Sequence, residues 1–145
     1  EGMKKFQSIK LFDDPLFLVL SKEHQLAPKK IINVNELKNE PFIALDEGDE
    51  KDFMIYLRSL GIELNVQYNL CDDNSIIAMV ENNLGLAILP KLALLAGHFD
   101  IADTPIEPKI SRPIGIIYKS KDLISASSRI FINYLIEHTK NYPDV

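Results

Sequence analysis

Short uninterrupted apolar runs, each followed by polar turns and helical patterns, constrain this chain more than any other feature. The clearest runs are residues 16–20, 42–45, 86–89 and 113–118. All are far shorter than the ~20 apolar residues that a membrane-spanning helix needs. A short run that is apolar throughout predicts a strand buried on both faces, as in a parallel sheet. We therefore expect a mainly parallel sheet and place the strand 16–20 inside it.

Helical patterns separate these strands. Residues 53–60 place apolar side chains three and four positions apart, and Gly61 follows where a left-handed C-terminal cap belongs. The polar residues 72–75 can cap a helix over 76–82, and the closing segment 125–139 is amphipathic. Strands that alternate with helices through short connections predict a single α/β domain whose sheet is flanked by helices.

The other predicted elements have weaker signals. They are a short helix over 34–38 capped by Asn35, a half-exposed strand over 65–70, a short helix over 91–95 opened by Pro90, a weak strand over 99–102, and a loop around Pro105 and Pro108.

The charge balance argues against a surface that grips nucleic acid. The 145 residues include 16 lysines and arginines against 21 aspartates and glutamates, a formal net charge of −5, and the basic residues do not cluster. With neither a membrane span nor an export signal, the sequence predicts a cytoplasmic protein. Glu1 and Gly2 before Met3 suggest a tag remnant or a fragment of a longer chain.

Enzyme chemistry has little support in the sequence. His24, His98 and His138 are far apart and belong to no zinc-binding pattern, and there is no glycine-rich phosphate loop. Cys71 is better explained as a small buried hydrophobe than as a reactive thiol, because the two carboxylates after it disfavour the thiolate. We expect no catalysis, no metal and no cofactor.

The ends of the predicted strands are better candidates for a binding site. In an open α/β sheet the ligand lies outside the carboxyl ends of the strands, where the following helices also point backbone N–H groups. We expect a polar ligand there, next to the turn at Pro90. The candidate residues are Asp46, Glu47, Gly48, Asp72, Asn74 and Ser75. A plain helix-capping role for the same residues is the alternative.

Several segments also follow one another in a distinctive order. A strand and a His-x-Leu-Ala element occupy 16–27, and a short helix then precedes a Pro-Phe-Ile strand. A helix, a glycine turn and a strand ending in proline follow over 76–90. With the closing strand 112–118 and the closing helix, this order resembles the effector-binding region of LysR-type transcriptional regulators. Asn83 stands where that family usually has glycine, and asparagine tolerates the left-handed conformation that a turn can need.

The resemblance implies a periplasmic-binding-protein-like (type 2) fold with two lobes. Residues 16–110 would form the second lobe, and residues 111–145 would return into a first lobe whose first half is absent. The helix-turn-helix domain that binds DNA would also be absent. The resemblance further implies a small-molecule effector between the lobes, a homo-oligomer and no membrane association. A solute-binding protein of a transporter and a small α/β enzyme share this fold and are the alternatives.

An incomplete first lobe has a physical consequence for the helix over 125–139. A helix gains most of its stability by burying its apolar face, and this helix would lack its usual sheet partner. We therefore expect it to pack on the remaining lobe or on another subunit. We also expect weak or undetectable effector affinity, because small-molecule sites normally enclose most of a ligand's surface.

Overall fold

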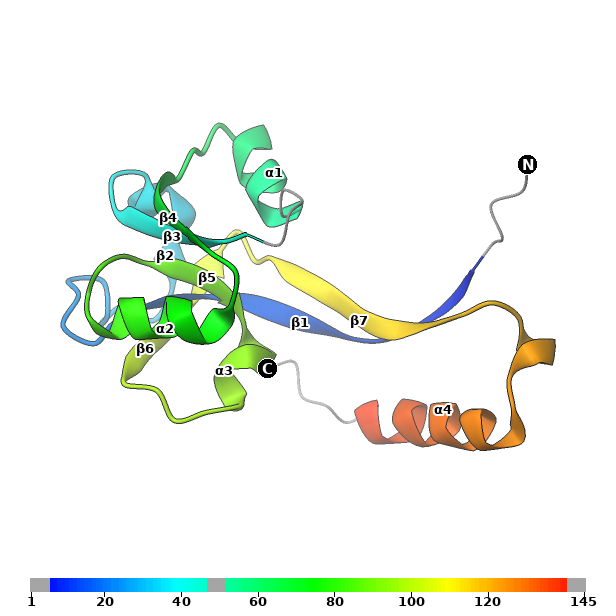
Figure 1. The fold of residues 1–145 in the computed structure, drawn as a ribbon. Coiled ribbons are helices and arrows are strands. Elements are labelled where there is room, and N and C mark those ends of the chain that lie inside the picture. Colours follow the sequence, from blue (N-terminus) through cyan, green and yellow to red (C-terminus); the bar gives the residue numbers. More distant parts are fainter. Residues whose placement is uncertain (1–5, 47–51, 141–145) are drawn as a thin grey trace. The chain divides into compact units, whose positions relative to one another are not determined.

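The computed structural model describes residues 6–46 and 52–140 (Figure 1). The elements, in chain order, are β1 (Gln7–Ser21), β2 (Ile32–Asn33), the 3-10 helix η1 (Val34–Leu37), β3 (Pro41–Leu45), α1 (Asp52–Ser59), β4 (Asn65–Leu70), α2 (Asp73–Glu81), β5 (Ala87–Pro90), α3 (Lys91–Leu95), β6 (Ile101–Glu107), β7 (Ser111–Tyr118), the 3-10 helix η2 (Lys121–Leu123) and α4 (Ala126–Thr139). The chain divides into two compact units. Unit 1 contains residues 1–14 and 111–145, and unit 2 contains residues 15–110.

The sheet of unit 2 is mixed, with both parallel and antiparallel pairs of strands. On one side, β5 and β6 flank β1, and both pair with it in antiparallel fashion, while β2 runs parallel to β6. On the other side, β3 runs parallel to β4, and an isolated parallel bridge links Phe42 of β3 to Leu86, the residue before β5. Among the described strands of unit 2, β2 to β6 therefore share one direction and β1 opposes them.

The prediction for residues 16–20 is wrong in one respect, because this strand lies antiparallel to both neighbours. Leu18, Val19 and Leu20 are fully buried between β5 and β6. An unbroken apolar run reports burial on both faces, and a central antiparallel strand that is covered on both faces has the same run. The path of the chain, and not the apolar run, sets the direction of β1. This strand begins its pairing with β5 at Leu16, opposite Pro90, where β5 ends.

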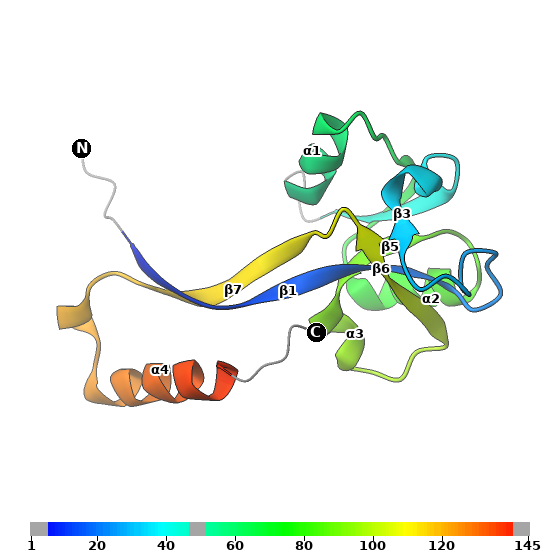
Figure 2. The same cartoon turned by 180° about the vertical axis from the view of Figure 1, so that it is seen from behind.

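The side chains of β1 alternate between two hydrophobic cores, one on each face of the sheet. Leu16, Leu18 and Leu20 face a core that η1 and α1 cover with Leu37 and Leu57. Val19 faces the second core. The residues that α2 and α3 contribute to it are Ile76, Ile77, Val80 and Leu94. Figures 1 and 2 show α1 on one side of the β1 strand, and α2 and α3 on the other. The sheet is thus flanked by helices on both faces, as the sequence predicts.

Strand β6 extends into the segment where the prolines predict a loop. Pro105 lies in the antiparallel ladder opposite Phe17. The pairing of β6 with β2 involves Ile106 and Glu107, so Pro105 is paired with β1 and not with β2. Proline is tolerated at strand positions with one open edge, so a proline alone does not exclude a strand.

Two helix starts differ from the prediction. Asn33, and not Asn35, caps η1, because its side chain accepts a hydrogen bond from the Asn35 backbone N–H at 3.0 Å. The Glu36 carboxylate accepts in turn from the Asn33 N–H at 3.2 Å, which completes a capping box. Helix α2 begins at Asp73, earlier than the apolar pattern indicates, because the first turn of a helix is often polar.

The two expected left-handed positions are confirmed. Gly61 follows α1 with φ +72°, and Asn83 follows α2 with φ +55°. Both turns return the chain to the sheet, and the predicted strand over 65–70 and helix over 91–95 are found with these bounds as β4 and α3. The backbone conformation of these turns was therefore readable from residue type alone.

Unit 1 contains the first part of β1, together with β7 and α4. β1 pairs with β7, and a Cβ added at Gly115 would lie 2.6 Å from the backbone oxygen of Ile9. Helix α4 begins after Ser125, whose side chain accepts from the Ser128 N–H at 3.1 Å. No residue of α4 is buried, and Ile130 is 71 % exposed. The expectation that α4 packs on the remaining lobe or on another subunit stays a prediction.

Candidate functional site

The carboxyl ends of β3, β4 and β5 lie at one edge of the sheet of unit 2, because these strands share a direction. Leu45 and Leu70 are partners at the ends of β3 and β4, and the Asp46 N–H donates to the Leu70 carbonyl at 2.7 Å. Asp46 therefore lies beside the segment that leads into α2. Glu47 and Gly48, the other two candidates after β3, lie outside the described residues.

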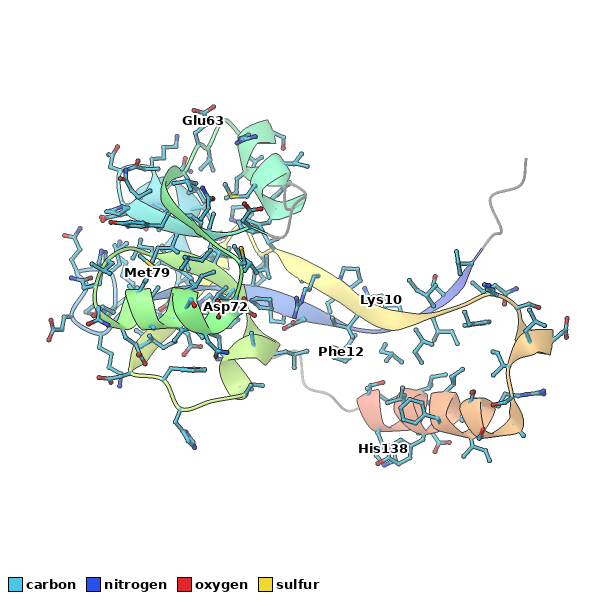
Figure 3. All side chains as sticks on the ribbon, viewed as in Figure 1. Lys10, Phe12, Glu63, Asp72, Met79 and His138 are labelled. Atoms are coloured by element: carbon cyan, nitrogen blue, oxygen red, sulfur yellow. The ribbon has the colours of Figure 1, made fainter. Side chains whose placement is uncertain are left out.

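Three further candidates lie at the start of α2, where Figure 3 labels Asp72. Asp72 is the N-cap, and its carboxylate accepts a hydrogen bond from the Ser75 backbone N–H at 2.9 Å. Two hydrogen bonds from Ser75 lower the pKa of Asp72 below its usual value. The bond from the Ser75 side chain has the larger effect, and the bond from its backbone has the smaller one. Asn74 and Ser75 are exposed. The capping role is thus established for Asp72, and a ligand-binding role for these residues stays a prediction.

Sequence reasoning missed two charged groups near this edge. Lys91, the first residue of α3, pairs with the carboxylate of Asp103 and lies 4.7 Å from the centre of the Phe17 ring. The sequence did contain a signal for Lys91, because this lysine directly follows the proline that ends β5. Asp73 has a buried Oδ1 atom with no hydrogen-bond partner in the described part of the chain. The edge is therefore of mixed polarity, as expected, and its lysine is already paired with a carboxylate.

Histidine, cysteine and carboxylate side chains are the groups that a metal site would need. Residues 6–46 and 52–140 contain no cluster of three or more His, Cys, Asp or Glu side chains that could hold a metal ion. His24 lies 3.4 Å from the Glu40 carboxylate through Nε2, and its Nδ1 accepts from the Leu26 N–H at 3.2 Å. These contacts hold the turn after β1. In the same ranges, no helix has the length and apolar character that crossing a membrane requires.

Cys71 is exposed, so the expectation of a small buried hydrophobe is wrong. It stands in the turn between β4 and α2, where the chain leaves the sheet. An apolar environment cannot be inferred for a residue that follows the last position of a strand.

The lowered pKa of Asp72 predicts a pH-dependent contribution to stability. A carboxylate whose pKa is lower in the folded chain stabilises it above its unfolded pKa of about 4, and this contribution is lost as pH falls through the folded value. Asn can also cap a helix but does not titrate in this range. We therefore expect the free energy of unfolding to fall less in Asp72→Asn than in the wild type between about pH 5 and about pH 3.

Urea unfolding at the two pH values measures this difference. Asn74→Ser is the matched control, because it changes a neighbouring exposed residue without removing a titratable group. Equal losses of stability in Asp72→Asn and in the wild type would contradict the expectation.

Comparison with known proteins identifies related sequences. The family model of the LysR substrate binding domain matches residues 2–140. The uncharacterised HTH-type transcriptional regulator YvbU of Bacillus subtilis is 28 % identical over 133 residues, which cover 89 % of this chain and 45 % of the relative. The HTH-type transcriptional activator CmpR of Synechocystis is 25 % identical over 87 % of this chain and 43 % of that protein. The chain thus spans less than half the length of these relatives, and the resemblance seen in the sequence is confirmed.

Solved structures share the fold. The regulatory domain of Synechocystis CcmR in complex with 2-PG superposes with a TM-score of 0.84 at 20 % identity, over 97 % of this chain and 70 % of that one. The effector binding domain of QuiR in complex with shikimate gives a TM-score of 0.79 at 22 % identity, over 97 % of this chain and 68 % of the other. The expected periplasmic-binding-protein-like (type 2) α/β class is confirmed.

Proposed function

Because this chain belongs to the LysR substrate binding domain family, we propose that it is the effector-sensing domain of a bacterial transcriptional regulator. The match over residues 2–140 carries the proposal. The family comprises transcriptional regulators and not enzymes, which disfavours the enzyme alternative. The transporter alternative has less support, because the curated relatives are described as regulators.

We propose that the effector is a small molecule bound at the carboxyl edge of the unit 2 sheet. The CcmR and QuiR domains were solved with 2-PG and with shikimate, which supports a small-molecule ligand for this chain also. The residues proposed to bind it are Asp46, Glu47, Gly48, Asp72, Asn74 and Ser75. The exposed amide of Asn74 can donate to the ligand, and the hydroxyl oxygen of Ser75 and the carboxylates can accept from it.

We propose further that residues 16–110 form the second lobe and residues 111–145 part of the first. The division at residues 14/15 and 110/111 supports these limits, and so does the greater length of the related regulatory domains. DNA binding then belongs to a separate helix-turn-helix domain of the whole protein. Assembly into a homo-oligomer and a cytoplasmic location are part of the same proposal.

Measuring ligand binding tests the function. The protein used is the whole gene product that contains this chain. The probes are small metabolites that include 2-PG and shikimate, and the readout is calorimetry with the purified protein. We expect Asn74→Ala and Ser75→Ala each to weaken binding by about tenfold, because each removes one hydrogen bond to the ligand.

Asn39→Ala is the control, since Asn39 is exposed just before β3, at the opposite edge of the sheet. It should leave the affinity unchanged. Equal affinity in the Asn74 and Ser75 variants and the control would exclude this edge as the site. Failure of every probe to bind, and of the whole protein to bind DNA from its own promoter, would count against the regulator function itself.

A further inference from the structure

The start of helix α2 in unit 2 already holds a negative group of its own. Hydrogen bonds from the Ser75 side chain and then from its backbone lower the pKa of Asp72, which is therefore ionised at neutral pH. The N–H groups at a helix N-terminus are the donors that bind anionic ligands in many proteins. At α2 the carboxylate of the N-cap has taken that place (Figure 3). An anionic effector at this position would have to compete with Asp72.

A second acceptor at the same helix start lacks a donor. The Oδ1 atom of Asp73 is buried and has no hydrogen-bond partner within residues 6–46 and 52–140. A buried polar atom without a partner costs free energy, so it gains from any group that can complete its hydrogen bonding. Asp73 Oδ1 needs a donor, and an ionised carboxylate on a ligand could only accept. A ligand with N–H groups would supply what this atom lacks.

The charges of the neighbouring strand ends point in the same direction. Asp46, directly after β3, is exposed and adds another carboxylate to this edge. Lys91, directly after β5, is a lysine at the edge, but its charge is balanced by the carboxylate of Asp103. The Lys91 ammonium group also lies 4.7 Å from the centre of the Phe17 ring. The described part of the edge therefore offers a ligand mainly acceptors and a negative potential.

We propose that the effector presents a cationic nitrogen group, an amine or a guanidinium, to the carboxyl edge of the unit 2 sheet. The inference rests on the binding function proposed for that edge. Ammonium and guanidinium groups donate several hydrogen bonds each and accept none, and charge-assisted bonds to carboxylates are the strong ones. Such a group is complementary to Asp46, Asp72 and Asp73 together, whereas a carboxylate is repelled by all three.

NMR titration of this chain with two probes of opposite charge tests the inference. Agmatine carries an amine and a guanidinium, and succinate carries two carboxylates. Agmatine should shift the amide resonances of Asp46 and Asn74 in a saturable way, and succinate at the same ionic strength should not. Asp72→Asn should weaken agmatine binding by about tenfold, the factor expected for the loss of one charge-assisted hydrogen bond, because asparagine keeps the helix cap but removes the charge.

Asp100→Asn is the matched control. Asp100 is exposed and directly precedes β6, so it lies at the opposite edge of the same sheet. Both variants change the net charge by one, so an effect of overall charge alone would weaken agmatine binding equally in the two, which would overturn the inference. No saturable shift with agmatine would also overturn it. Saturable shifts with succinate alone would overturn it too, but would keep this edge as a binding site. DNA binding by the whole gene product reports separately on the regulator function.

Discussion

Phe42→Ala should lower the free energy of unfolding by about 3–5 kcal/mol, the range for removing a large aromatic side chain from a core. Phe42 is 1 % exposed and lies in the core that η1 and α1 cover. Its position on β3 is also where that strand bridges to Leu86 of the β5 side. The variant therefore loses buried apolar area and leaves a cavity beside the contact that joins two parts of the sheet.

Urea unfolding followed by circular dichroism measures the effect. Phe131→Ala on α4 is the matched control, because that ring is 60 % exposed and its loss should change stability by less than about 1 kcal/mol. Domains of ordinary stability have about 5–15 kcal/mol in total, so Phe42→Ala should also reduce the yield of folded protein. Similar midpoints for the two variants would show that the β3 contact does not hold the sheet together.

Gly85→Ala should destabilise the chain by about 1–3 kcal/mol, the usual cost of forcing an extra methyl group into a packed site. Gly85 is buried, and a Cβ there would lie 2.9 Å from the Pro41 carbonyl oxygen and 3.0 Å from Ile43 Cγ1. That oxygen accepts from the Leu86 N–H at 2.8 Å, and the Ile43 N–H donates to the Leu86 carbonyl at 2.8 Å. The added methyl group therefore pushes β3 away from the strand that holds it in the sheet.

Gly97→Ala is the control for this substitution. A Cβ at Gly97 would meet the far end of the Phe99 ring, a side chain that can turn away, and Gly97 is exposed. We expect the control to cost less than about 1 kcal/mol. Hydrogen exchange at the Leu86 amide should accelerate in Gly85→Ala and not in Gly97→Ala. The same exchange rate in both would indicate that the strands accommodate the methyl group without separating.

Sequence patterns predicted the elements that local chemistry determines. Period-two and helical spacing located β4 and α1, and residue type identified the left-handed turns at Gly61 and Asn83. The direction of β1 was not readable, because burial on both faces produces one pattern for both directions. A parallel environment was predicted for residues 16–20 because continuous apolar runs are typical of strands in parallel sheets. The path of the chain instead places this strand antiparallel to both neighbours.

The candidate site was predictable only in part for a similar reason. Strand ends can be located from the sequence, and the register of Leu45 with Leu70 brings the predicted segments together. Side-chain pairs between distant positions cannot be located in this way. Arg112 and Asp14 are 98 positions apart, and only the fold makes them neighbours. Lys91 pairs with Asp103 from a neighbouring strand, so the charge that it carries at the site edge could not be judged from sequence.

The position of β1 between β5 and β6 affects the order in which the chain can assemble during synthesis. The apolar residues 16–20 are made before their partners on β5 and β6, which begin at Ala87 and lie about half of this sequence later. At about 5–20 residues per second, the ribosome needs several seconds to produce those partners. Until then residues 16–20, of which Leu18, Val19 and Leu20 are fully buried in the folded chain, lack these partners. The nascent chain therefore exposes a ready site for chaperones or for aggregation, and the central strand becomes ordered only when β5 and β6 reach it.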